Sequence, residues 1–399
     1  MNPKTKVNLF LAKHNFSIEP PHMLYNSIIE DMKKGLSTGE SDQAMIKAGS
    51  AVIRSIQEGE TAIVIDAGGT NFRSCLVTKT TNGIEISDFE KTSMPAIGRE
   101  LNKKEFYAAI AKNISRLKDR SNKISFCFSY AMTITEDGDG KIIRFSKEIK
   151  ANEAVGTYLG KELLSELKIQ GWKKVEKINV LNDTTALLLS SFVEHTDKKW
   201  GSHLAFILGT GMNSAYINQK RIIVTECGMF SQLPQSDFDI TVCSQTTQPK
   251  QSLLEKMCAG AYLGEIATAM VSSAAKENLF SPSFTAPEYF ETKDFDSYFT
   301  EEDSKLSPDQ LLIKEMVYAI ITRSGYLTAE AVYAAAACTD KEKGELPLCI
   351  TCNGSTFWKT PLLKKAVEGR LQILLQQPFE IIKIDDDITK GSFAAAFIN

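Results

Sequence analysis

The chain has 399 residues, 43% of them hydrophobic, and a formal net charge of -3 from 46 Lys and Arg against 49 Asp and Glu. This composition is too apolar for a disordered protein, and the length suffices for roughly two or three domains. The near balance of charge argues against binding nucleic acid or an anionic membrane through bulk electrostatics. No apolar run approaches the ~20 residues of a membrane-spanning helix, and the N-terminal apolar stretch is too short for a signal peptide. We therefore expect a cytoplasmic protein, with neither nucleic acid nor a membrane as partner.

The eight cysteines are spread along the chain, mostly within apolar stretches. This pattern is typical of reduced, buried thiols in an intracellular protein. Cys349 and Cys352 form one C-x-x-C pair, but there is no second pair and the four histidines are distant in sequence. Because a structural zinc site needs more ligands, we predict no metal site of protein ligands alone.

Two similar hairpins are predicted in the first half of the chain. Residues 42–57 first place apolar side chains on one helical face, which predicts an amphipathic helix leading into a strand. Residues 61–79 then hold two β-rich apolar runs around a Gly-Gly-Thr-Asn turn, and residues 203–220 repeat the construction around Gly-Thr-Gly. Two such hairpins, about 140 residues apart, suggest two related half-domains.

The remaining elements alternate between helix and strand. In chain order they are a helix at 103–117, a strand at 123–130, a charged loop at 135–141, a helix-to-strand unit ending at Leu181, long helices at 251–275 and 311–338 around a surface connection, a strand at 346–352 and a last helix. This alternation indicates an α/β chain. We divide it into an N-terminal helical segment that packs on the large lobe (1–57), a small lobe (58–190) and a large lobe (191–399).

The glycine turns have neither the spacing of a dinucleotide fingerprint nor the lysine of a Walker loop. Gly68, Gly69, Thr70 and Asn71 can nevertheless turn the backbone tightly and present amides and a hydroxyl to anionic oxygens. An ordinary hairpin turn is the alternative, but Asp66 would place a charge inside an apolar strand and the second hairpin matches the first. Together the turns predict a phosphate clamp between two domains, with Asp66 placed to order Mg²⁺ and its water shell.

Asn182 and Asp183 follow an apolar strand and precede a predicted helix. The simpler interpretation is that Asp183 caps this helix. The C-terminal end of a strand is also where α/β proteins place reacting groups, and a fixed carboxylate there can act as a general base. Both interpretations can hold together.

Over residues 62 to 362, eight segments resemble, in order, those of the hexokinase and glucokinase family, which has the sugar-kinase, actin and heat-shock ATPase fold. IDAGGTNFRSCLV and LGTGMNSAY resemble its two phosphate motifs, and CNGSTFWKTPLL resembles its adenosine motif. The segments that resemble sugar-binding ones are FCFSYA, RFSKEI, LNDTTALLLS, TECGMF and LLEKMCAGAYLGEI. Any one match is weak, but eight in the right order are specific.

The resemblance implies a duplicated, two-domain actin-like ATPase (ribonuclease H-like) α/β fold with a cleft between the lobes. It also implies transfer of the ATP γ-phosphoryl group to a hexose 6-hydroxyl, with Mg²⁺, domain closure over the sugar and Asp183 as general base. The implied sugar-binding residues are Ser129, Ser146, Lys147, Asn182, Asp183, Asn213, Glu226 and Glu255. The implied nucleotide-binding residues are Asp66, Gly68, Gly69, Thr70, Asn71, Arg73, Thr210, Thr292, Gly354 and Ser355. Glucose is the expected hexose, with mannose and fructose as alternatives, and the protein is expected to be a monomer or a homodimer.

Several alternatives stay open. Glu255 and Glu265 could be solvated positions on a helix, and Lys147 could lie on the surface. The segments depart from the family pattern at six positions, which put the sugar and nucleotide preference in doubt: Ala131, Phe145, Glu148, Val224, Cys227 and Asn353, the last standing where the family has Asp. A catalytically silent sugar sensor and a chaperone-like ATPase of the same fold are the competing functions.

Overall fold

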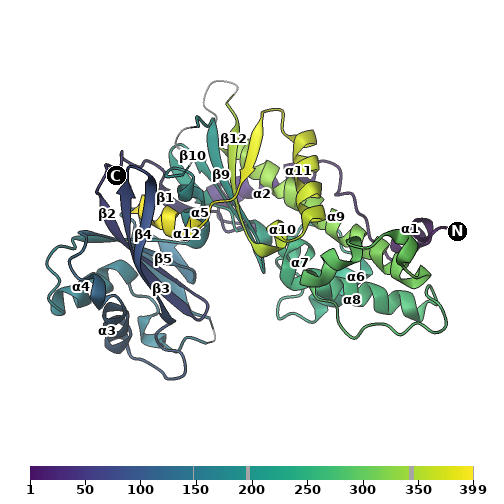
Figure 1. Ribbon diagram of the computed structural model, residues 1–399, viewed down its shortest axis with the longest axis horizontal. Coiled ribbons are helices and arrows are strands. Elements are labelled where there is room, and N and C mark those ends of the chain that lie inside the picture. Colours follow the sequence, from purple (N-terminus) through teal and green to yellow (C-terminus); the bar gives the residue numbers. More distant parts are fainter. Residues whose placement is uncertain (147, 195–197, 341–345, 399) are drawn as a thin grey trace.

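Two β-sheets organise the chain, one in each of two lobes (Figure 1). The structure is a computed structural model that describes residues 1–146, 148–194, 198–340 and 346–398. Both sheets contain an antiparallel meander followed by two parallel strands. This shared topology supports the two related halves predicted from the repeated hairpins.

In the described part of the chain, the small-lobe sheet has five strands in the order β4-β3-β2-β5-β8. The strands are β2 (Thr61–Gly68), β3 (Asn71–Thr80), β4 (Gly83–Ser93), β5 (Lys123–Phe128) and β8 (Lys177–Leu181). Helices α3 (Lys103–Asn113) and α4 (Leu159–Ile169) cover one face, where their apolar side chains share a core with Ile63 and Ile65 of β2. A separate hairpin of β6 (Ala131–Ile134) and β7 (Gly140–Arg144) follows β5.

The large-lobe sheet has, within the described ranges, six strands in the order β1-β11-β10-β9-β12-β13. The strands are β1 (Ile46–Ser50), β9 (Ser202–Leu208), β10 (Met212–Asn218), β11 (Arg221–Val224), β12 (Leu348–Asn353) and β13 (Phe379–Ile382). The chain enters this sheet at β1, which pairs antiparallel with the edge of the meander at β11. The N-terminal segment therefore contributes a strand to the large lobe.

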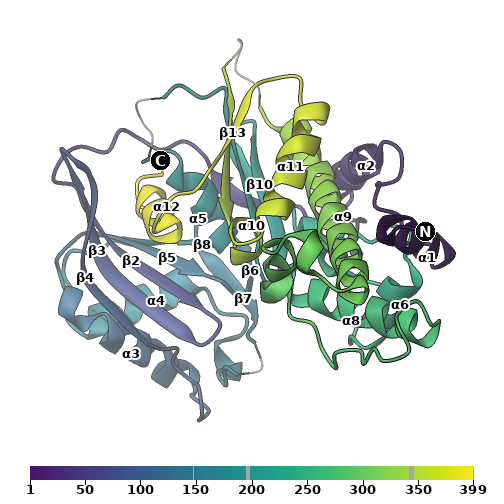
Figure 2. The same cartoon turned by 45° about the vertical axis from the view of Figure 1, so that its right-hand side comes forward.

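Most of the helices belong to the large lobe (Figure 2). They are α1 (Pro3–Lys13), α2 (Leu24–Ser37), α6 (Asp237–Ser244), α7 (Leu253–Cys258), α8 (Gly260–Lys276), α9 (Pro308–Cys338), α10 (Ser355–Trp358) and α11 (Pro361–Leu374). Short 3-10 helices lie at Ser115–Leu117, Asn152–Ala154, Cys227–Met229, Thr292–Phe299 and Asp303–Lys305. The long helix α9 is buried along most of its length, and α1 and α2 pack on it. All eight cysteines lie in the described ranges and are free, and seven are buried.

Two helices cross between the lobes. α5 (Asp183–Ser190) follows the last strand of the small-lobe sheet but packs on β9, β10 and β12 of the large-lobe sheet. α12 (Asp387–Ala395) follows the last strand of the large-lobe sheet but packs on β2 and β5 of the small-lobe sheet. The two helices contact each other so closely that a Cβ on Gly391 would lie 1.7 Å from the carbonyl oxygen of Ala186. The pair α5 and α12 thus forms the structural connection between the lobes.

Several predicted elements need correction. Residues 42–57 do not form a helix, because residues 46–50 pair with β11 and Gly49 takes a positive φ of 114°. The predicted helix at 251–275 is two helices, α7 and α8, which meet at Ala259 in an extended conformation. The predicted domain boundaries fail for α5 and α12, since each packs on the sheet of the other lobe. The hairpins and the helices near 103–117 and 311–338 are confirmed.

Candidate active site

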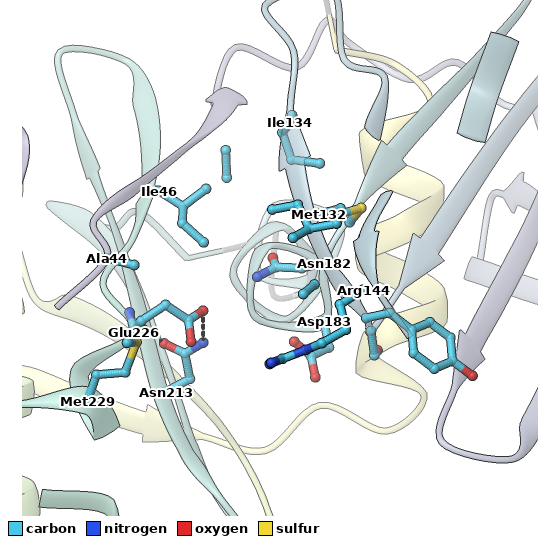
Figure 3. A pocket seen from close by; sticks show the side chains of 15 residues that line it. Ala44, Ile46, Met132, Ile134, Arg144, Asn182, Asp183, Asn213, Glu226 and Met229 are labelled. Atoms are coloured by element: carbon cyan, nitrogen blue, oxygen red, sulfur yellow. Dashed lines mark hydrogen bonds between the residues drawn. The ribbon is translucent and has the colours of Figure 1, made fainter. Parts of the chain in front are cut away.

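A cavity of about 450 Å³ lies between the two lobes (Figure 3). Its lining residues are Ala44, Ile46, Ala48, Ser129, Tyr130, Ala131, Met132, Ile134, Ile143, Arg144, Asn182, Asp183, Asn213, Glu226 and Met229. Figure 3 shows Asn213 and Glu226 of the large lobe facing Asn182 and Asp183 across it. Five of the predicted sugar-binding residues therefore line one cavity: Ser129, Asn182, Asp183, Asn213 and Glu226.

Asn182 and Asp183 stand where β8 ends and α5 begins. Asn182, and not Asp183, is the helix cap, because its side-chain oxygen accepts a hydrogen bond from the Thr185 amide at 2.8 Å. Asp183 is the first helical residue, and its Oδ1 accepts a hydrogen bond from the Thr184 amide at 2.7 Å. Burial raises the pKa of Asp183, the hydrogen bonds from Thr184 oppose that rise, and the charge of Asp66 adds to it. The cap thus fixes the backbone while the Asp183 carboxylate is held in the cavity wall.

Asn213 and Glu226 form a hydrogen-bonded pair on the large-lobe side. The Asn213 side-chain amide donates to Glu226 Oε1 at 2.7 Å, and the Glu226 backbone amide donates to Asn213 Oδ1 at 3.0 Å. Glu226 takes a left-handed φ of 54°, which an L residue adopts only when its surroundings hold it there. Burial raises the pKa of Glu226, and the charges of Asp183 and Glu255 raise it further. The carboxylates of Asp183 and Glu255 therefore lie close enough to Glu226 to affect its ionisation.

Two further sugar candidates, Glu255 and Ser146, are not among the lining residues. Glu255 sits on α7 behind the second hairpin, where its Oε2 accepts a hydrogen bond from the Met212 amide at 3.0 Å. Burial is the main cause of its raised pKa. The Ser146 hydroxyl is buried and has no hydrogen-bond partner among the described residues. Lys147 lies outside the described residues.

The first hairpin combines a charged pair with a tight glycine turn. Arg73 donates to Asp66 Oδ2 at 2.6 Å, and the two residues are directly paired across β2 and β3. Gly69 has a positive φ of 58°, and its carbonyl oxygen accepts a hydrogen bond from the Tyr130 hydroxyl at 2.7 Å. Between β2 and β3, Gly69 and Thr70 are exposed. Asn71 begins β3 opposite Gly68.

A second cavity, of about 340 Å³, lies beside the second hairpin. It is lined by Thr210, Gly260, Ala261, Tyr289, Glu291, Thr292, Lys293, Ser355, Thr356, Lys359 and Thr360. Gly354 turns the chain into this cavity with a φ of 123°, and a Cβ there would lie 2.1 Å from the Leu208 carbonyl oxygen. The Thr292 hydroxyl donates to the Gly260 carbonyl oxygen at 2.7 Å and accepts from the Gly264 amide at 3.0 Å. Thr292 thus braces α8 as well as lining the cavity.

Within residues 1–146, 148–194, 198–340 and 346–398, no three His, Cys, Asp or Glu side chains are grouped so that they could hold a metal ion. In the same ranges, no helix combines the length and the apolar character needed to cross a membrane.

Comparison with protein families decides the relationship of this chain. Two family models, both described as "Hexokinase", match this chain, one over residues 6–193 and the other over residues 203–398. The chain belongs to the hexokinase family. Hexokinase-2 of Equus caballus is 23% identical over 93% of the chain, and glucokinase-1 of Kluyveromyces lactis is 26% identical over 77% of the chain and 78% of its own length. The chain spans about half the length of the hexokinase-2 relatives, 45% of the Equus caballus protein.

The solved structures of hexokinases have the same fold. The hexokinase of Schistosoma mansoni, complexed with glucose, superposes with a TM-score of 0.76 at 19% identity over 99% of both chains. A second hexokinase crystal structure gives a TM-score of 0.79 at 17% identity, over all of this chain and 97% of that one. The duplicated, two-lobed actin-like ATPase fold expected from the motifs is thus confirmed.

Two residues of this hexokinase-family chain escaped the sequence analysis. Arg144, at the end of β7, is the one basic side chain among the described residues that line the cavity between the lobes, and it extends into that cavity (Figure 3). Its place as the first residue of RFSKEI, two positions before the serine, was the available signal. Asp387, at the start of α12, lies in none of the eight segments and was therefore not predicted. Its side chain nevertheless accepts a hydrogen bond from Asn353 of the adenosine segment.

Proposed function

We propose that this member of the hexokinase family transfers the γ-phosphoryl group of ATP to the 6-hydroxyl of a hexose, with glucose the expected substrate. The observation that carries the proposal is the cavity in which Asp183 meets Asn182, Asn213 and Glu226. Carboxylates accept hydrogen bonds from sugar hydroxyls, and carboxamides both accept and donate, so the two kinds of group together can pair with vicinal hydroxyls. The glucose bound in the Schistosoma mansoni hexokinase structure supports the choice of sugar.

The chemistry follows from the position of Asp183. As the sugar O6 forms a bond to the γ-phosphorus, the bond from that phosphorus to the β–γ bridging oxygen breaks and ADP leaves. Asp183 accepts the proton that O6 loses. Its raised pKa makes it a stronger base than an exposed aspartate, provided that the site operates above that pKa. The hydrogen bond from Thr184 keeps the carboxylate fixed in the cavity wall.

The phosphates would lie between the two glycine turns, with the adenosine in the cavity of about 340 Å³ near Ser355. Asp66 suits Mg²⁺, because this ion keeps most of its water ligands and takes one or two carboxylates from a protein. The Asp66 side chain is 15% exposed and can reach such a water shell. Bound Mg²⁺ would neutralise charge on the phosphates. Arg73 would orient the Asp66 carboxylate.

Closure of the lobes would exclude water from the cavity and suppress ATP hydrolysis. The pair of helices α5 and α12 supports this step. Helix α5, which begins with Asp183, follows a strand of the small-lobe sheet along the chain but packs on the large-lobe sheet. A rotation about this pair would change the width of the cavity while keeping Asp183 at its centre.

An assay that couples ADP release to NADH oxidation tests the proposal. The purified chain is given ATP and Mg²⁺ with glucose, mannose or fructose, and sugar-dependent ADP release is expected. Its absence with all three hexoses would contradict the proposal. Sugar binding without turnover would indicate a sugar sensor, and sugar-independent ATP hydrolysis stimulated by polypeptide would indicate a chaperone-like ATPase.

A further inference from the structure

A side-chain hydrogen bond joins the adenosine segment to the helix that crosses between the lobes. The Asn353 amide donates to Asp387 Oδ2 at 2.6 Å, and the other oxygen of Asp387 accepts from the Ile388 amide at 2.7 Å. Asp387 is 7% exposed, so both of its oxygens are used within the protein interior. A charge-assisted hydrogen bond in such surroundings is stronger than one at the surface.

The Asn353 end of this bond controls the turn beside the nucleotide cavity. Asn353 is the last residue of β12, where it pairs with Ile207 of β9. The next residue, Gly354, makes the tight turn past Leu208, and Ser355 then lines the cavity. Gly354 has no side chain that could hold the turn, so neighbouring side chains must fix it: Asn353 on one side, and on the other Trp358, whose indole donates to the Cys352 carbonyl oxygen at 2.9 Å.

The Asp387 end leads to the proposed base. Asp387 is the first residue of α12, and α12 packs against α5 through the close contact of Gly391 with Ala186. α5 in turn begins with Asp183. Burial raises the pKa of Asp387, and the charge of Asp66 on the first hairpin adds to that rise. Asp387 therefore lies within the electrostatic reach of the first hairpin while it binds the adenosine segment.

We propose that the hydrogen bond between Asn353 and Asp387 sets the position of the nucleotide turn relative to Asp183, which makes Asp387 a positioning residue for phosphoryl transfer. This inference rests on the proposed function. It also assigns a role to Asn353, which stands where the family motif that this segment resembles has Asp. In this chain the carboxylate of the pair comes from α12 and the amide from β12.

Four variants test the pair: Asp387→Ala, Asn353→Asp, the double variant Asn353→Asp with Asp387→Asn, and Asp385→Asn as control. Asp385 is two residues away, and its side chain is 89% exposed. Asp387→Ala should raise the dissociation constant of ADP and the KM for ATP about tenfold, since a charged hydrogen bond is lost, and leave the KM for glucose within about twofold. Asn353→Asp places two carboxylates together and should raise the dissociation constant of ADP at least as much as Asp387→Ala does. The double variant exchanges amide and carboxylate and should recover ADP affinity to within about threefold of the wild type.

Two readouts separate positioning from a purely structural role. The melting temperature of each variant shows how much is lost to stability, and ADP binding measured by calorimetry needs no turnover. An unchanged ADP dissociation constant in Asp387→Ala would overturn the inference, and so would a double variant no better than Asn353→Asp. The wild type is assayed first with hexoses: a lack of turnover there refutes the proposed function, while the ADP dissociation constants still decide whether the pair holds the nucleotide turn.

Discussion

The two glycine hairpins have the same topology, but different interactions hold them. The turn of β2 and β3 is held within the small lobe, by the ion pair of Asp66 with Arg73 and by the Tyr130 hydroxyl. The turn of β9 and β10 has no charged residue, and it is held by α8 and α10, because the Gly209 carbonyl oxygen accepts from the Gly260 amide at 2.8 Å and from the Thr356 hydroxyl at 2.9 Å. The two hairpins share their backbone topology, but the ion pair between their own strands is present in the first hairpin alone among the described residues.

One detail is shared by both hairpins. A Cβ on Gly68 would lie 2.9 Å from the Cβ of Ser129, and a Cβ on Gly211 would lie 2.9 Å from Oε2 of Glu255. Each hairpin thus uses a glycine to make room for a residue proposed to hold the sugar. The comparison indicates that each glycine turn and a proposed sugar-binding residue are packed as one unit in each lobe.

The largest effect is expected for Asp183, which lies between the hairpins. Asp183→Ala should lower kcat about a thousandfold, because the group that accepts the hydroxyl proton is removed. Glucose binding, measured by calorimetry, should change little. Retention of a tenth of the wild-type activity would exclude Asp183 as the sole base.

Glycine replacements should reveal how rigidly each turn is built. Gly354→Ala should lower the free energy of unfolding by about 3 kcal/mol, because its positive φ and the contact with the Leu208 carbonyl leave no room for a Cβ. Gly69→Ala should cost about 1 kcal/mol, since only the left-handed φ opposes it. Urea unfolding measures both, and equal losses would show that the two turns are equally constrained.

The two packed glycines give a closer test. Gly68→Ala should raise the KM for glucose about tenfold, because the added methyl group displaces the Cβ of Ser129 and with it the backbone. Gly211→Ala should raise it only about threefold, because it meets the far end of the flexible Glu255 side chain. The opposite order, measured by the coupled assay, would mean that Glu255 matters more to the sugar than Ser129.

The pH dependence reports on the carboxylates between the hairpins. Because burial raises the pKa of Asp183, the acidic limb of kcat/KM should lie above the ordinary range of an aspartate. A carboxyl group with a raised folded pKa costs stability once the pH exceeds its unfolded pKa. Asp183→Asn should therefore melt at a higher temperature than the wild type at neutral pH. The difference should vanish in acid, below the ordinary pKa of aspartate, and an advantage that persists there would have another cause.

The smallest effect is expected from the tie between Tyr130 and the first turn. Tyr130→Phe removes the hydrogen bond to the Gly69 carbonyl oxygen and should lower the free energy of unfolding by about 1 kcal/mol. The KM for ATP should rise less than about threefold. A larger rise would show that the first turn depends on this tie as strongly as the second depends on α8 and α10.

The sequence predicted the parts of the fold whose signals are local. Both hairpins were found because β-branched runs flank glycine turns, and the helix around Pro308–Cys338 was found from its length and apolar pattern. Residues 42–57 were mistaken for a helix, because the spacing of their apolar residues suits a helix as well as an edge strand. Pairing with β11, a contact distant in sequence, decides between the two.

The sequence predicted those residues of the candidate site that lie in short, recognisable motifs. Five of the proposed sugar residues line the cavity because short segments place them at strand ends and turns. Arg144 and Asp387 were not predicted, since their roles depend on which elements meet in space. Asp387 reaches Asn353 only because α12 packs on the opposite lobe, and nothing near residue 387 indicates that contact.

The packing of α12 on the small lobe also bears on how the chain folds as it is synthesised. Phe393 and Phe397 complete a small core with Ala62, Val64 and Cys75 of β2 and β3. The small-lobe strands leave the ribosome roughly 200 residues before α12 does, which at about 5 to 20 residues per second is a delay on the order of 10 to 40 seconds. Throughout that delay one apolar face of the small-lobe sheet has no cover, so the nascent chain offers a binding surface for chaperones that the finished protein conceals.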